Sequence, residues 1–291
     1  MSSAARHTRS RDTRLAWMLL GPALLLLSAV AVVPLTATIW ESLHSHDLRM
    51  PWLGRPFVGL GNYRAALTDT RLHDAIIHTA GFAAASVALE LALGIALALT
   101  LDSLSRGRAV ARVVVLLPWA LPTVVAALVW RFMFDTQGIA GLFYQDWLSR
   151  PHTAWVPIVL GDVWKSTPFV ALLLLAGLQG IDSSLYEAAR MDGASAWRRF
   201  VHITLPLLRP AMAVALVFRT LDAFRVFDLV YVLTAGGPGT STEVLSLYAF
   251  TTLLQDLRFG YGSALAVITF GLTFALALAY VRLLRTQEER A

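Results

Sequence analysis

The chain has 291 residues, of which 57% are hydrophobic and only 15% are charged, and its mean hydropathy is +0.62. This composition excludes an ordinary soluble domain, which needs far less apolar surface, and it predicts that most of the chain lies in lipid. The net charge of +5 comes from an excess of Lys and Arg, and the absence of cysteine excludes disulfides and thiolate metal sites.

Six apolar segments are long enough to cross a bilayer, since a helical span needs about 20 residues. They are Leu15–Trp40, Ala75–Leu101, Val110–Phe134, Trp155–Ile181, Leu205–Leu233 and Gly262–Leu284. Because unpaired backbone groups are costly in lipid, we expect helices rather than open strands. The predicted fold class is therefore all-α, a polytopic membrane protein with six transmembrane helices in residues 15–284, between short tails at 1–14 and 285–291.

The arginines indicate the orientation, since cytoplasmic loops collect positive charge. Clusters precede the first span, follow the sixth, and fill the inner loops, at Arg6–Arg14, Arg106–Arg112, Arg190–Arg209 and Arg282–Arg290. We therefore expect both termini in the cytoplasm, and the pI near 10.0 is a topology signal rather than a sign of nucleic-acid binding. A cleaved signal peptide is the alternative for the N-terminus, but the first apolar run is longer than a typical signal core.

On the opposite side of the membrane, the longest segment is Glu41–His73. Its run FVGLGNYRAAL predicts a turn that leads into a short interfacial helix, which either contacts another protein or caps the bundle. Between the fifth and sixth spans, Gly236–Thr242 has the composition of a turn.

The inner segment at 182–205 carries its own helix signals. Ser184 and Glu187 have the spacing of a capping box, in which the serine is the N-cap and the glutamate reaches back to it. Gly193 suits a left-handed C-terminal stop, so this helix has about two turns and needs packing to be stable. Ala188 and Ala189 keep its middle free of bulk, so another surface can approach closely. From these signals alone, a well-capped helix between two spans is the simpler interpretation.

The same segment resembles the docking loop, known as the EAA motif, by which permease subunits of bacterial ABC importers engage their ATPases. The resemblance lies in Glu187, Ala188 and Ala189, followed by Asp192 and Gly193 and then by Ile203, Leu205 and Pro206. The stretches VWKSTPFVALLLLAGLQGID and FRTLDAFRVFDLVYVLTAGGPGTSTEVLSLYAF resemble, more narrowly, the permeases of carbohydrate importers related to the maltose transporter. This resemblance covers nearly all of the chain from Leu15 onward.

The resemblance implies the permease fold of a type I importer in the bacterial inner membrane. Such a chain works as one half of a heterodimer with a second permease, together with two ATPase subunits and an extracytoplasmic sugar-binding protein. It is not an enzyme, because ATP and Mg are bound by the ATPase, and this chain has no GxxxxGK[ST] phosphate loop. The residues that would face the ATPase and couple its closure to the spans are Glu187, Ala188, Ala189, Asp192, Gly193 and Pro206.

Ionisable residues within the predicted spans are candidates for function, since an unpaired charge there is expensive. They are Glu90, Asp162, Lys165, Arg219, Asp222, Arg225 and Asp228. The spacing of three predicts pairing of Asp162 with Lys165 and a self-neutralising ladder from Arg219 to Asp228. Glu90 stands alone, so we expect it to pair with a backbone group or an arginine inside the bundle. A polar seam between subunits is the structural interpretation of the ladder.

The resemblance also implies a substrate path lined by Ser166, Phe169, Arg219, Ala223 and Val226. Ala223 and Val226 lack the amides of the disaccharide-binding family member, so the partner permease or weak contacts could carry the recognition.

Two alternatives remain at this point. The same mechanism could carry glycerol phosphate or its diesters, since an anion would use an unpaired arginine in the path. A proton-coupled secondary transporter would instead use Glu90 or Asp162. His78 and His202 have no ligand partner at metal-binding spacing, so no metal site is predicted.

Overall fold

The computed structural model describes residues 3–104 and 106–288, and it describes the side chains of 17–104 and 106–283. Residues 1–2 and 289–291 of the two predicted tails, and the side chains of Arg6–Arg14, lie outside this description. The chain divides into two units, one formed by Met1–Thr68 with Ala249–Ile268 and the other by Asp69–Tyr248 with Thr269–Ala291.

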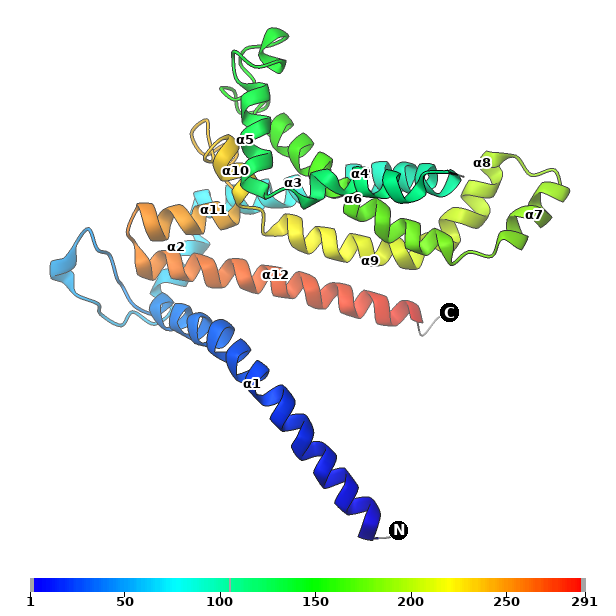
Figure 1. The fold of residues 1–291 in the computed structure, drawn as a ribbon. Coiled ribbons are helices and arrows are strands. Elements are labelled where there is room, and N and C mark those ends of the chain that lie inside the picture. The colour runs from blue at the N-terminus through cyan, green and yellow to red at the C-terminus, as the bar shows by residue number, and fades with distance from the viewer. Residues whose placement is uncertain (1–2, 105, 289–291) are drawn as a thin grey trace. The chain divides into compact units, whose positions relative to one another are not determined.

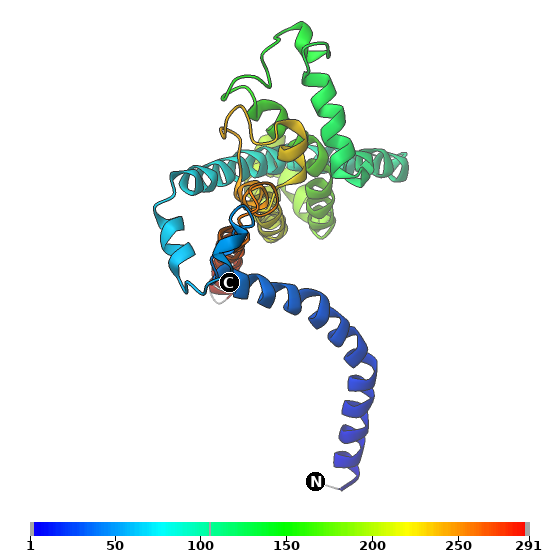
Figure 2. The same ribbon diagram turned by 90° about the vertical axis from the view of Figure 1, so that its left-hand side faces the viewer.

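The described residues form helices and turns, with only isolated β-bridges (Figures 1 and 2). The longer helices are α1 (Ser3–Ser42), α3 (Thr70–Ser103), α4 (Arg108–Ala120), α5 (Thr123–Phe134), α6 (Trp155–Gln179), α9 (Leu205–Phe224) and α12 (Phe259–Glu288). The shorter ones are η1 (Pro51–Leu53), α2 (Gly61–Leu67), η2 (Ala140–Leu142), α7 (Ser183–Met191), α8 (Ala196–Arg199), η3 (Phe200–Thr204), α10 (Asp228–Leu233), α11 (Leu245–Phe250) and η4 (Thr251–Gln255). The all-α prediction is confirmed.

Five of the described helices are long and apolar enough to cross a membrane, and a sixth span exists if a bent pair is counted as one. That pair is α4 and α5, which meet at 84°. The predicted span Val110–Phe134 is therefore present as two helices with a sharp bend between them, not as one helix. Pro122 forces the preceding Leu121 into an extended conformation (ψ 140°), and neither Pro122 nor Pro118 has an N–H to continue the ladder.

The predicted fifth span is also interrupted. It was expected to run to Leu233, but α9 ends at Phe224 and α10 begins at Asp228. Between them, Phe227 has a non-helical backbone (φ −140°, ψ −66°). Two of the six predicted spans thus contain a break.

The centre of the second unit is the packing of α3, α6 and α9, which lie side by side. Glycines allow close approach: a Cβ added to Gly94 of α3 would lie 2.6 Å from Val170 Cγ1 of α6, and one added to Gly177 of α6 would lie 2.6 Å from Ala211 Cβ of α9. In lipid the hydrophobic effect does not drive helices together, so transmembrane helices associate mainly through close packing at small residues. The buried apolar residues around this contact are Ala98, Leu101, Val170, Leu174, Leu175, Leu178, Leu208 and Ala215.

The end of the second unit at which α3 and α6 begin is held by polar contacts. Arg71 at the start of α3 forms a two-pronged ion pair with Glu243, with Nε and Nη2 donating over 2.6 and 2.7 Å. Trp155 Nε1 at the start of α6 donates to the Ser241 carbonyl over 3.1 Å. The predicted turn at Gly236–Thr242 is confirmed, and these contacts attach its end to two spans.

In the first unit, the segment after α1 folds around Asn62 of α2. Its side-chain amide donates to the carbonyls of Ser42 (2.8 Å) and His44 (2.9 Å), and Tyr63 shares a hydrogen bond with Ser42 (2.6 Å). The predicted turn and short helix in FVGLGNYRAAL are confirmed, since α2 spans Gly61–Leu67.

We predict that Gly94→Ala destabilises the protein. The methyl group collides with the fully buried Val170, and overpacking of this kind costs about 1–3 kcal/mol. Gly81→Ala on the same helix is the matched control, because its Cβ meets nothing within 4 Å. Both substitutions raise helix propensity equally, by about 1 kcal/mol. The thermal unfolding midpoint of the purified protein should fall in the first variant only, and equal midpoints would contradict this packing.

Candidate functional site

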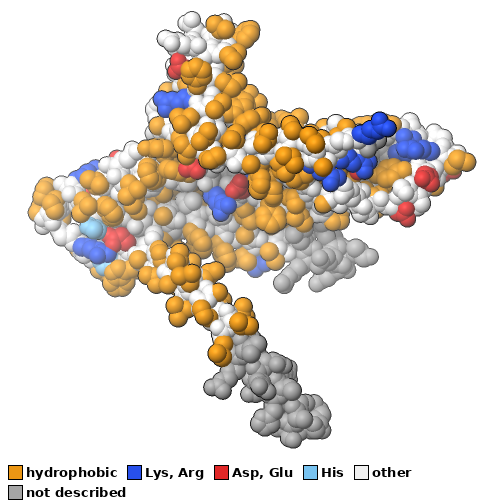
Figure 3. Space-filling view, in the orientation of Figure 1, with side chains coloured by type: hydrophobic (Ala, Val, Ile, Leu, Met, Phe, Trp, Pro, Cys, Tyr) orange, Lys and Arg blue, Asp and Glu red, His pale blue; other side chains and the backbone are white. Residues whose placement is uncertain are grey.

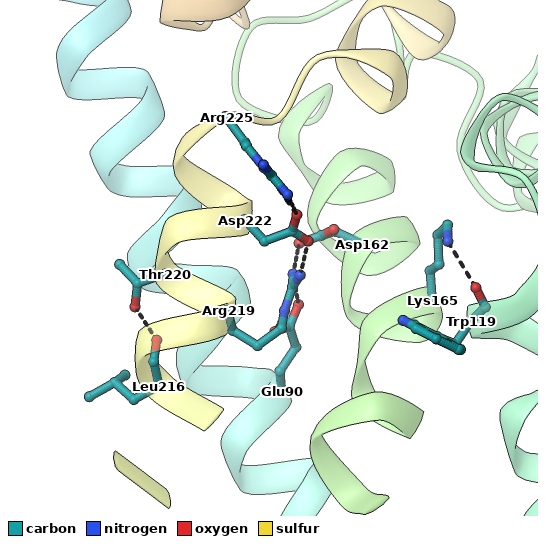
Figure 4. Close-up of polar contacts among 9 residues, drawn as sticks. All are labelled: Glu90, Trp119, Asp162, Lys165, Leu216, Arg219, Thr220, Asp222 and Arg225. Carbon is teal, nitrogen blue, oxygen red and sulfur yellow. Dashed lines mark hydrogen bonds and ion pairs between the residues drawn. The ribbon is translucent and has the colours of Figure 1, made fainter. Parts of the chain in front are cut away.

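Arg219 of α9 forms a buried ion cluster with acids from two other helices (Figure 4). Its side chain is only 4% exposed. Nε and Nη2 donate to Glu90 of α3 over 2.5 and 2.8 Å, and Nη2 also donates to Asp162 of α6 over 3.1 Å. Two-pronged arginine–carboxylate pairs are among the stronger ion pairs, and the expected pairing of Glu90 with an arginine is confirmed.

The predicted ladder on the fifth span is only partly correct. Asp222 accepts from both Arg219 and Arg225, the latter over 3.1 Å from Nη2. Asp228 does not continue the ladder, because it lies beyond the break, in the first turn of α10.

The predicted pair of Asp162 and Lys165 is wrong. Asp162 pairs with Arg219, while Lys165 Nζ donates to the backbone carbonyl of Trp119 over 3.2 Å (Figure 4). That carbonyl lies at the end of α4, next to the break, where the regular helix cannot supply a partner. A tertiary contact therefore replaces the local one.

A cavity of about 440 Å³ lies beside the ion cluster, between the break that separates α4 from α5 and the one that separates α9 from α10. Its lining residues are Trp119, Thr123, Asp162, Lys165, Ser166, Phe169, Phe218, Arg219, Asp222, Ala223, Arg225, Val226, Phe227, Asp228 and Leu229. All five residues of the predicted substrate path are among them, from α6 and from α9 and its end; their role in passage stays a prediction.

Sequence reasoning missed Trp119 and Thr123, which come from the broken third span. The Trp119 and Phe169 rings stack, with centroids 5.7 Å apart and planes at 14°. The two prolines in LPWALP were the available signal, because they mark a place where a span has to break.

The predicted docking helix is α7, but its cap differs from the prediction. Asp182, not Ser184, is the N-cap: its Oδ1 accepts from the Ser184 backbone N–H over 2.9 Å. This hydrogen bond holds the pKa of Asp182 below its ordinary value. The capping box with Glu187 is therefore wrong, because an acid two residues upstream of Ser184 takes the cap position.

The predicted stop at Gly193 is confirmed. Gly193 has φ +75°, its N–H donates to the Arg190 carbonyl, and the Ala194 N–H donates to the Ala189 carbonyl over 2.9 Å. This is the hydrogen-bond pattern of a Schellman motif, which requires a left-handed residue at this position.

The exposed surface of α7 and α8 carries both charged and apolar side chains. Glu187, Ala188 and Asp192 are exposed, and charged side chains gather over this end of the second unit in Figure 3. Met191 and Trp197 are exposed as well, at 90% and 73%, and the sequence analysis did not single them out.

Contacts connect α7 to the start of α9. The Tyr186 hydroxyl shares a hydrogen bond with the buried Thr204 hydroxyl (3.0 Å), and Arg199 Nη1 donates to the Ala194 carbonyl (2.6 Å). Thr204 ends the π-helical turn η3, which continues directly into α9, and Pro206 is the second residue of α9. The loop at 182–205 is thus joined directly to the helix that carries Arg219.

Comparison with known proteins places this arrangement in a family. A family model described as "Binding-protein-dependent transport system inner membrane component" matches residues 90–288. The chain belongs to this family of inner membrane components. The family prediction made from the docking loop is therefore confirmed, and the chain is a multi-pass transport subunit rather than an enzyme.

Several relatives of this inner membrane component are similar over nearly their whole length. The trehalose/maltose transport system permease protein MalF of Thermococcus litoralis is 42% identical over 288 residues, which cover 96% of each chain. The trehalose transport system permease protein SugA of Mycobacterium tuberculosis is 40% identical, covering 95% of this chain and 90% of the relative. The sulfoquinovosyl glycerol transport system permease protein SmoG of Agrobacterium fabrum is 38% identical, covering 95% and 92%.

The fold of the component matches a solved structure as well. A bacterial ABC transporter involved in the import of the acidic polysaccharide alginate contains a chain with a TM-score of 0.82 at 22% identity, covering 98% of this chain and 99% of that one. The likeness establishes the type I importer permease fold.

We predict that Asp182→Ala loosens the start of α7. The carboxylate caps this helix at neutral pH, and because its folded pKa is lowered, the stabilisation is present above its ordinary pKa and is lost as the pH falls through the folded value. Hydrogen exchange of the α7 amides at pH 7 should accelerate several-fold in this variant. Asp182→Ser is the control, because serine caps about as well as aspartate. Unchanged exchange in the alanine variant would show that the cap is not needed.

Proposed function

We propose that this chain is one of two permease subunits of an ATP-driven importer for a sugar, a di- or oligosaccharide. The observation that carries the proposal is the cavity at the two helix breaks, with the stacked Trp119 and Phe169 on its wall and hydroxyl and charged groups beside them. Its volume of about 440 Å³ falls within the range of about 300–1,000 Å³ for small-molecule sites. The names of the relatives, which include trehalose and maltose permeases, support a sugar as the cargo.

In this proposal the loop at 182–205 couples a separate ATPase to the spans. Glu187, Ala188, Ala189, Asp192 and Gly193 would face a groove of the ATPase, which binds ATP and Mg, and Pro206 would fix the return of the chain into the membrane. Closure of two ATPase subunits would push α7, and the contact of Tyr186 with Thr204 would pass that movement to α9. The cavity would then open alternately to either side as bundles of helices rock against each other.

The surroundings of the chain follow from the same proposal. Residues 15–284 would form the membrane domain in a bacterial inner membrane, with tails at 1–14 and 285–291 in the cytoplasm. A second permease would complete the pathway, and an extracytoplasmic sugar-binding protein would deliver the cargo. The family description and the alginate transporter solved with a substrate-bound periplasmic protein support a binding-protein partner.

Neither the alternative cargo, glycerol phosphate, nor the alternative energy source, a proton gradient, is favoured. A glycerol phosphate would need an unpaired arginine, but Arg219 and Arg225 are both engaged by carboxylates. A proton-coupled transporter would need a carboxylate that is free to take up a proton, whereas Glu90 and Asp162 both pair with Arg219.

The test of the proposal is ATP hydrolysis and uptake by the complex purified through a tag on this chain and reconstituted in liposomes. Hydrolysis should rise several-fold when the binding protein is loaded with trehalose or maltose, and uptake should continue after the proton gradient is collapsed. Uptake that survives inactivation of the ATPase and stops with the gradient would instead identify a secondary transporter.

We predict that Gly193→Val uncouples hydrolysis from uptake while leaving membrane insertion intact. A β-branched residue cannot easily adopt φ +75°, so the Schellman turn should open and α7 should lose its fixed end. Gly107→Val is the matched control, since Gly107 has φ +72° and meets nothing within 4 Å, but it lies before α4, outside the docking loop. The ratio of sugar transported to ATP hydrolysed should fall in the Gly193 variant and stay near the wild-type value in the control. Equal ratios in both would remove the assigned role of this turn.

A further inference from the structure

Glu90 is the one member of the ion cluster that stands behind the cavity rather than in its wall. Its side chain is 0% exposed, and it does not line the cavity, while its partner Arg219 does. Asp162 and Asp222, the other carboxylates on Arg219, both reach the cavity surface. Any effect of Glu90 on a bound cargo must therefore act through its charge and through the guanidinium that it holds.

The charges around the cavity are closely balanced. The wall carries three carboxylates, Asp162, Asp222 and Asp228, and three cations, Lys165, Arg219 and Arg225. Glu90 adds a fourth carboxylate directly behind Arg219.

Both arginines of the wall are paired with carboxylates, and the lysine is hydrogen-bonded. Arg219 pairs with three carboxylates, Arg225 pairs with Asp222, and Lys165 donates to the Trp119 carbonyl without an ion pair in the described part of the chain. An anionic cargo would thus meet no surplus of positive charge.

We infer that Glu90 sets the charge preference of the cavity, by cancelling the charge of Arg219 so that an uncharged sugar is favoured over an anionic one. This inference rests on the proposed function, and it names the substrate class. The question of charge is relevant to the relatives, because their names include neutral sugars and a sulfonated one, sulfoquinovosyl glycerol. Glu90 is a specificity-determining residue that does not touch the cargo.

The expected size of the effect follows from Coulomb's law. Removing one negative charge about 10 Å from the cargo, at an effective dielectric constant of about 20, changes the binding of a singly charged ligand by on the order of tenfold. A neutral sugar should be nearly unaffected, since it carries no net charge. The ratio of the two affinities therefore reports the charge of the cavity and not merely its stability.

The experiment uses the complex, purified through a tag on this chain and placed in nanodiscs without the binding protein. Trehalose and trehalose 6-phosphate are the probes, and calorimetric titration measures the ratio of their dissociation constants. The wild type should prefer trehalose. Glu90→Gln should shift the ratio by tenfold or more toward the phosphate, and the double variant Glu90→Gln with Arg219→Gln should return it toward the wild-type value, because it removes one charge of each sign.

Glu243→Gln is the matched control. It removes the same charge from a similar two-pronged pair, with Arg71, but this pair does not line the cavity. Its ratio should equal that of the wild type. A shift as large as that of Glu90→Gln would show that any lost carboxylate disturbs the protein, and it would overturn the inference.

A second comparison covers the case in which Glu90→Gln does not assemble. Arg219→Lys and the double variant Glu90→Gln with Arg219→Lys also differ by one charge, and in both the cation at position 219 has acidic neighbours in Asp162 and Asp222. The double variant should bind the phosphate about tenfold better than Arg219→Lys, and equal binding would overturn the inference.

Two other outcomes separate the inference from the proposed function. A wild type that binds trehalose, with a ratio that does not respond to Glu90, would overturn the inference and leave the sugar cavity in place. A wild type that binds neither probe would overturn both.

Discussion

The buried guanidinium of Arg219 is the constraint on which the centre of the second unit depends. It joins α9 to α3 through Glu90 and to α6 through Asp162. Such a cluster costs free energy to desolvate, and removing one partner from a buried pair typically costs about 3–5 kcal/mol because a charge is left without compensation. The three helices can therefore separate only if the cluster rearranges as a whole. The ion pair of Asp162 with Arg219 thus holds α6 and α9 together at the wall of the cavity.

The breaks in two spans are the second determinant of the cavity. Irregular backbone is tolerated at membrane depth only where other protein groups or a water-filled cavity satisfy it. Here Lys165 donates a hydrogen bond to the Trp119 carbonyl at the α4–α5 break, and Ser246 donates one to the Val226 carbonyl at the α9–α10 break. The same groups that satisfy the breaks thus lie in or beside the cavity, so the polar cavity and the interrupted helices require each other.

Composition and hydropathy were enough to predict the class of the fold and the apolar segments, because these depend on sums over about 20 residues. The α4–α5 break was not predicted, since Pro118 and Pro122 stand in a stretch that remains apolar throughout. The α9–α10 break has no proline to mark it. Local spacing rules failed where a tertiary partner was available: Lys165 is three residues from Asp162, yet Asp162 pairs with Arg219. The prediction of the N-cap of α7 was wrong for a different reason. Asp182 and Ser184 are both good N-cap residues, and only the structure shows that Asp182 is used. Glu90 was predicted to find an arginine, but the sequence did not specify which one.

The loop at 182–205 leads directly into the helix α9, which also lines the cavity. Thr204 shares a hydrogen bond with Tyr186 of α7 and directly precedes Leu205. Arg219 lies 14 residues beyond Leu205 on the same helix, about 21 Å along its axis. In the proposed function, a push on the loop would be carried along α9 to the ion cluster, because both lie on one helical run. Arg219 already contacts carboxylates on two neighbouring helices and on its own, so a shift of α9 can exchange one of these partners for another while the guanidinium remains paired. A buried charge that keeps a partner in each arrangement lets the bundle change shape without the cost of exposing it to lipid, and this is the property that an alternating pathway through the cavity requires.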